Sequence, residues 1–128
     1  MGDLLEQIIN HLIAGGFASA KDVDIFKDYS PEDPDNCIVV YEYNGSPVAR
    51  GTNMNVRAIQ IVCRNLKAKE AKLLSWNIYN YLYKQDYFIA FGARKCLIAL
   101  RNTPIKTGVD EKNRLLWAFN LAITTNFD

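Results

Sequence analysis

RLLWAFNLAITTNF, residues 114–127, is the stretch of sequence that decides the fold. Large apolar side chains occupy every second position, at Leu115, Trp117, Phe119, Leu121 and Ile123. The positions between them are mainly small or polar: Leu116, Ala118, Asn120, Ala122 and Thr124. A two-residue period predicts a β-strand with one apolar face and one face of small, partly polar groups. This strand is more than twice as long as the usual five or six residues, which favours a sheet that carries an extended surface.

Two segments have the spacing of amphipathic helices. Residues 3–14 place Leu4, Ile8 and Leu12 on one stripe, with Asp3 as a candidate N-cap. Residues 68–84 carry a second stripe, formed by Ala71, Leu74, Ser75, Ile78 and Leu82. Both stripes predict helices that pack on a sheet. The remaining aromatic residues of the second helix indicate either a protein interface or rings that lie over the sheet edge; they are Trp76, Tyr79, Tyr81 and Tyr83.

Further strands are predicted at residues 36–43, 55–64 and 95–101, with a short one around 23–26. The order is α-(β)-β-β-α-β-β, which predicts one α+β domain over residues 1–128. In that domain a mainly antiparallel sheet of four to five strands has two helices packed on one face. An eleven-residue loop, 44–54, separates two of the strands. It is long for a hairpin connection, and long loops in compact domains tend to be functional.

Composition excludes several classes of partner. The chain has 15 basic and 14 acidic residues, so no overall charge attracts nucleic acid or an anionic membrane. The opening residues lack the basic start of a signal peptide, and no apolar run approaches the ~20 residues that span a bilayer. We therefore expect no membrane partner and no sequence-specific nucleic-acid binding. The basic group Arg94, Lys95, Arg101 and Lys106 indicates solubility and protection of a sheet edge.

The residue patterns of catalysis are missing. His11 is the single histidine, so a cysteine or serine nucleophile has little provision for a base. Gly15 and Gly16 follow a helix, whereas a phosphate loop precedes one. The acidic segment 21–36 lacks the glycine and final glutamate of a calcium loop, which favours a solvated loop, and Glu42 is expected to point outward at an edge. We predict no catalytic residue, no cofactor and no metal site.

Three cysteines, Cys37, Cys63 and Cys96, lie far apart and without CxxC spacing. An odd number with this spacing argues against a disulfide framework and against a zinc site. Free cysteine is among the most buried residue types. We therefore expect three buried thiols in a reducing compartment.

The organisation of the chain carries a resemblance to a known family. The relevant parts are the amphipathic start 4–13, the strands 35–40 and 56–64, the stretch 65–71 that leads into a helix ending near 81–83, and the polar turn 108–114 before the closing strand. In these parts the chain resembles phage minor capsid or tail-terminator proteins, also called tail completion or tail-to-head joining proteins, of long-tailed bacteriophages. The similarity covers nearly the full length and rests on organisation rather than on one invariant motif.

The resemblance implies a virion structural protein without catalytic residues. Such a protein forms a homo-oligomeric ring, typically a hexamer, on the tail tube protein, ends tail growth and provides the surface for the head connector or head-completion protein. It implies a place at the head-proximal end of the tail, host cytoplasm during assembly, and a ring through which phage DNA passes. The candidate interface residues combine the 44–54 loop with the small face of the last strand: Arg50, Gly51, Asn53, Met54, Ala118, Asn120 and Ala122.

Arg50 is the only charged residue of the loop, and the hypothesis pairs it with a carboxylate of segment 22–35 in an adjacent subunit. Other interpretations stay open at this point. One is another connector, head-closure or tail tube component of similar fold, and another is a small module that binds a peptide on a strand edge. A third is a hydrolase, which would need a pocket that gathers Glu42 or the acidic segment near a hydroxyl. A tube protein polymerises into long fibres, a terminator stops at discrete rings, and an interaction module stays monomeric.

Overall fold

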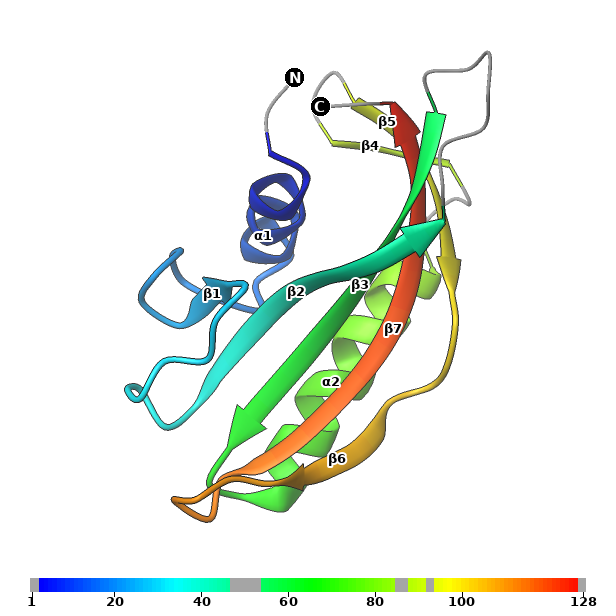
Figure 1. Cartoon of the computed structure of the whole chain (residues 1–128). Helices are drawn as coiled ribbons and strands as arrows, with labels where there is room; N and C mark the ends of the chain where they lie inside the picture. Colours follow the sequence, from blue (N-terminus) through cyan, green and yellow to red (C-terminus); the bar gives the residue numbers. More distant parts are fainter. Residues whose placement is uncertain (1–2, 47–53, 85–87, 92–93, 127–128) are drawn as a thin grey trace.

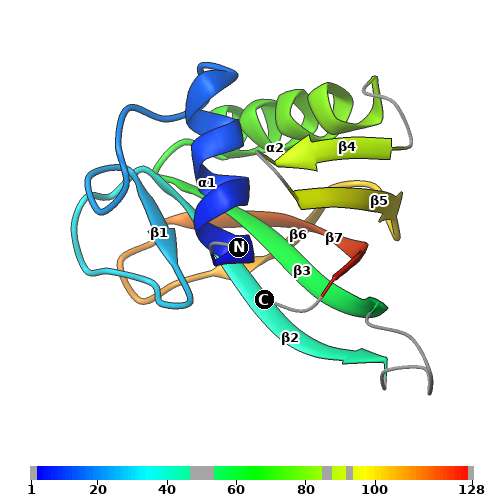
Figure 2. The same cartoon turned by 90° about the horizontal axis from the view of Figure 1, so that it is seen from above.

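A computed structural model of the chain describes residues 3–46, 54–84, 88–91 and 94–126. Its elements are α1 (Leu4–Ala14), β1 (Ile25–Lys27), β2 (Cys37–Ser46), β3 (Met54–Asn65), α2 (Ala68–Tyr83), β4 (Phe88–Phe91), β5 (Arg94–Leu100), β6 (Ile105–Val109) and β7 (Leu115–Asn126). They form one sheet of order β1-β2-β3-β7-β5-β4, in which β6 also pairs with β7. Among the strand pairs of the described residues, β1–β2 is parallel and the others are antiparallel. Both helices lie on the same side of the sheet (Figures 1 and 2).

The predicted fold class is confirmed: the chain is α+β, with a mainly antiparallel sheet and two helices on one face. The sheet has two strands beyond those expected. The residues of β6 are almost all exposed, so burial does not alternate along this strand as it does along β7. The short strand β4 has only four residues and pairs with β5 alone, at the end of the sheet order.

The connection between β2 and β3 is shorter than predicted. Strand β2 continues through Ser46, which pairs with Val56 beyond an irregularity that follows Tyr43. The glycine and serine of this segment therefore extend the strand instead of ending it. The predicted loop of residues 44–54 contracts to residues 47–53, which lie outside the described part of the chain.

Strand β7 fills the role that its sequence predicts. Its apolar side chains Phe119, Leu121 and Ile123 are buried beneath the helices. Leu115 and Trp117, near the start of the strand, are only half-buried, and the Lys72 ammonium lies 5.5 Å from the centroid of the Trp117 ring. The core therefore covers the middle and end of the strand more fully than its beginning.

The helices bury the stripes that their sequences predict, apart from Leu74 of α2, which is partly buried. Helix α1 begins at Asp3, whose carboxylate accepts a hydrogen bond of 2.8 Å from the backbone N–H of Leu5, as an N-cap does. The residues that the two helices bury are Leu4, Leu5, Ile8, Ile9 and Leu12 of α1 and Ala71, Ser75, Ile78 and Leu82 of α2. Within the described residues, neither helix is long and apolar enough to cross a membrane.

The three cysteines are buried thiols, as predicted. Burial raises the pKa of the Cys63 thiol to about 12 and also raises the pKa of Cys37. Because the thiolate is the reactive form, we expect no reaction of the native chain with a thiol reagent such as Ellman's reagent at pH 8. All three thiols should react once the chain is unfolded in urea. A native thiol that reacts within minutes would contradict this burial.

Candidate interaction surface

The outer face of the sheet is the face opposite the helices, and the predicted residues Ala118, Asn120 and Ala122 lie together on it. In the pairing register, Ala122 of β7 lies between Ala58 of β3 and Ala99 of β5. Three neighbouring strands thus place a methyl group in the same row. The result is a shallow alanine row that crosses the sheet.

The predicted alanines differ from their neighbours in exposure. Ala118 is 2% exposed and Ala122 is 6% exposed, whereas Ala99 is exposed. A partner that lay on this face would contact Ala99 directly. It would have little contact with Ala118 and Ala122, because neighbouring side chains already bury them. The accessible part of the alanine row is therefore its β5 end.

Asn120 ties the outer face to the segment between β5 and β6. Its backbone N–H donates to the Asn102 Oδ1 at 2.9 Å, and its carbonyl accepts from the Arg101 N–H at 2.8 Å. The Asn120 Oδ1 is buried and has no hydrogen-bond partner within the described residues. The backbone of Asn120 therefore holds residues 101–102 against β7.

A chain segment that was predicted to be a solvated loop covers part of the outer face. Residues 30–35 pack over the end of β3, where the Arg64 side chain is 2% exposed. Arg64 donates to the carbonyls of Pro31 at 2.7 Å, Pro34 at 2.6 Å and Asp35 at 3.1 Å, and to the Ser30 Oγ at 2.8 Å. The segment is a loop whose side chains are mostly exposed or half-buried, as predicted, but the buried Arg64 guanidinium also holds its backbone against the sheet, which the sequence did not predict.

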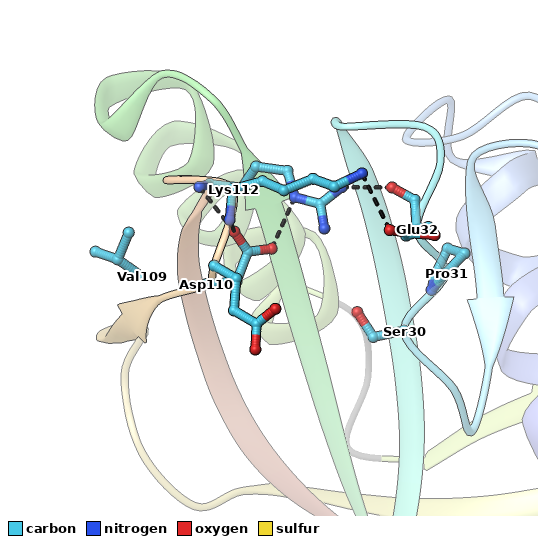
Figure 3. A pocket seen from close by; sticks show the side chains of 8 residues that line it. Ser30, Pro31, Glu32, Val109, Asp110 and Lys112 are labelled. Atoms are coloured by element: carbon cyan, nitrogen blue, oxygen red, sulfur yellow. Dashed lines mark hydrogen bonds and ion pairs between the residues drawn. The ribbon is translucent and has the colours of Figure 1, made fainter.

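A second arginine holds the same segment from β7. Arg114, which is 5% exposed, donates to the carbonyl of Glu32 at 2.6 Å. Its Nε donates to the Asp110 Oδ2 at 2.7 Å. These contacts bound a cavity of about 410 Å³ between residues 30–32 and the turn 109–112. Figure 3 shows Glu32 on one side of this cavity and Asp110 with Lys112 on the other.

Asp110 gives this anchor a pH dependence. Burial opposes its ionisation, but hydrogen bonds from the backbone N–H and the guanidinium of Arg114 outweigh burial and hold the pKa of Asp110 below its ordinary value. A carboxyl group whose pKa falls on folding stabilises the fold above its unfolded pKa, and that stability is lost as pH falls through the folded value.

We therefore expect Asp110→Asn to lower the free energy of unfolding at pH 7, and the difference from the wild type to shrink below about pH 4. Urea unfolding of both proteins at pH 7, 5 and 3 measures the effect. If the difference in free energy of unfolding between the two proteins is the same at all three pH values, the ionised carboxylate is not its cause.

Glu42 was predicted to point outward at a sheet edge, but in the structure it is paired with a neighbouring strand. Its carboxylate accepts hydrogen bonds from the Arg57 Nε at 2.6 Å and Nη2 at 2.7 Å. Glu42 lies on the same face of β2 as Ile38 and Val40, which belong to the core. The ion pair occupies the carboxylate, and the described residues hold no group of three or more histidine, cysteine or acidic side chains placed to bind a metal.

The other predicted interface residues belong to the β2–β3 connection. Arg50, Gly51 and Asn53 lie outside the described residues, and Met54 begins β3 opposite Asn126. The sequence reasoning also missed Arg64 and Arg114 as organisers of this surface. The strand period does give one signal, because it puts the charged Arg64 on the same face as Val62.

A family model described as bacteriophage tail terminator protein matches residues 13–127. The chain belongs to this family. The resemblance that the sequence suggested is thus confirmed over most of its length. The terminator is a component of the virion tail, and its family implies association with the tail tube. No curated protein matches it.

Proposed function

We propose that six copies of this terminator close a ring on the finished tail tube, stop its growth and present the surface that the head-completion protein joins. The ring acts without catalysis, sits at the head-proximal end of the tail, assembles in the host cytoplasm and lets phage DNA pass through. Family membership supports the association with the tube.

One observation carries the ring: the outer face over β3, β7 and β5 has no helix on it. Both helices pack on the other side of the sheet (Figure 2), and within the described residues the segment anchored by Arg64 and Arg114 covers the end of the face at β2, β3 and the start of β7. A sheet face of small residues lets another backbone approach closely, and head-to-tail contacts repeated about an axis close a ring. Ala118, Asn120 and Ala122 form part of that face in this proposal.

The β2–β3 connection is the second part of the proposed contact. It joins two long strands that reach the same end of the sheet, at Ser46 and Met54. We assign Arg50, Gly51, Asn53 and Met54 to the contact with the adjacent subunit or the tube. Charge reversal by Arg50→Glu should weaken capping of the tube, and an unchanged assembly profile would remove Arg50 from this role.

The test combines solution mass with electron microscopy. The chain is examined by sedimentation velocity up to millimolar concentration, and it is co-expressed with the tail tube subunit encoded by the same phage. We expect discrete rings and tubes of limited length, each closed at one end by a ring. Long fibres of the chain alone indicate a tube subunit, and tubes that grow without limit in its presence contradict termination.

A further inference from the structure

The near-zero net charge hides a strong separation of charge along the chain. Residues 1–42 carry nine acidic and two basic side chains, whereas residues 43–109 carry two acidic and eleven basic side chains. The fold preserves this separation in space. Strand β1 and residues 28–36 lie on one side of the molecule, and β5 and the segment leading to β6 lie on the opposite side (Figures 1 and 2).

Each side presents exposed charges. The acidic margin consists of Asp22, Asp28, Glu32 and Asp33, and the basic margin of Lys95, Arg101 and Lys106. Within the described part of the chain, the side chains of Asp33, Arg101 and Lys106 make no hydrogen bond or ion pair. Glu32 makes one pair, at 3.4 Å to Lys112, with its own side chain 83% exposed. The charges of the two margins are thus largely available to a partner.

Exposed apolar side chains accompany both groups of charges. Tyr29, 53% exposed, lies next to Asp28 in the acidic margin, and Ile105, 53% exposed, lies next to Lys106 in the basic margin. Protein interfaces combine a few large apolar contacts with a charged rim. Each margin thus combines an exposed apolar side chain with charged groups, and the two margins have opposite charge.

We propose that the acidic margin of one copy docks on the basic margin of the next copy, a contact that rests on the proposed ring and names the surfaces that form it. Two acidic margins repel each other, as do two basic ones, so the charges oppose a two-fold dimer and favour head-to-tail association. The alanine row ends at Ala99 on β5, beside the basic margin. The docked acidic margin therefore reaches the accessible part of the outer face.

Charge reversal tests this contact in both directions. Glu32→Lys with Asp33→Lys cancels the net charge of the acidic margin, because Asp22 and Asp28 remain, and Arg101→Glu with Lys106→Glu makes the basic margin weakly acidic. We expect each variant alone to lose at least about tenfold in self-association, measured by sedimentation velocity at low salt. An equimolar mixture should recover part of the association, because the unchanged acidic margin of one variant can still dock on the unchanged basic margin of the other.

A matched control changes the same amount of charge elsewhere. Lys67→Glu with Lys69→Glu alters exposed residues at the start of α2, and it should assemble like the wild type. Circular dichroism of every variant checks the fold. Carbodiimide cross-linking of the wild type should join Glu32 or Asp33 of one copy to Lys95 or Lys106 of another.

The outcomes separate this contact from the ring itself. Discrete rings that survive both reversals, or whose cross-links join other residues, overturn the contact and leave the proposed ring intact. Rings that form normally while the Arg101→Glu, Lys106→Glu variant loses affinity for double-stranded DNA overturn it in favour of a DNA-facing basic margin. A wild-type chain that forms no ring, alone or on the tube, contradicts the proposed function as well.

Discussion

Replacing Arg64 by methionine should lower the free energy of unfolding by about 3 kcal/mol. The methionine keeps the packing of the aliphatic stem, but the carbonyls of Pro31, Pro34 and Asp35 lose a buried donor. Unsatisfied buried acceptors cost more than the hydrogen bond itself contributes. Urea unfolding measures the loss, and limited proteolysis should show new cleavage within residues 28–36.

Arg101→Met is the matched control for this experiment. Arg101 is exposed, and within the described residues its side chain has no partner, so its replacement should change the free energy of unfolding by less than about 0.5 kcal/mol. If Arg64→Met unfolds like the wild type and shows no new cleavage site, the segment does not depend on Arg64 for its position.

Ala99→Gln should abolish assembly of the ring while leaving the fold intact. The residue is exposed at the accessible end of the alanine row, opposite Ala122, so a longer neutral side chain projects into the space that an adjacent copy would occupy. Overpacking a close contact costs about 1–3 kcal/mol, which we expect to repeat at each contact around a ring. Electron microscopy of tubes made with the variant should show uncapped, overlong tubes.

Ala68→Gln provides the comparison. Ala68 is an exposed first residue of α2, and a glutamine there is compatible with a helix. This variant should cap tubes like the wild type. Normal capping by Ala99→Gln would show that no copy lies over the β5 end of the outer face.

The sequence predicted those parts of the fold in which burial alternates with position. The period of β7 identified a long strand and its two faces, and both helical stripes are buried as expected. Strand β6 escaped prediction because it has only five residues and almost all of them are exposed, so burial does not alternate along it. Its position comes from pairing with β7, where register shifts at Lys106 and Gly108.

The surface was harder to predict than the core. The small face of β7 follows from Ala118, Asn120 and Ala122, but its partial cover does not. The main acceptors of Arg64 are backbone carbonyls about thirty residues away, and every residue has a carbonyl, so no pattern of side chains marks those acceptors. The family model identifies the chain as a tail terminator but does not say which residues contact another subunit.

The place of β7 in the sheet order has a consequence for synthesis of the protein. This strand is the last one along the chain, yet it joins β3 on one side to β5 and β6 on the other. Until the ribosome has released residue 126, β3 and β5 have open backbone edges that invite pairing with other chains. Nascent chains therefore lack the completed outer face, which forms only when β7 has been inserted between β3 and β5.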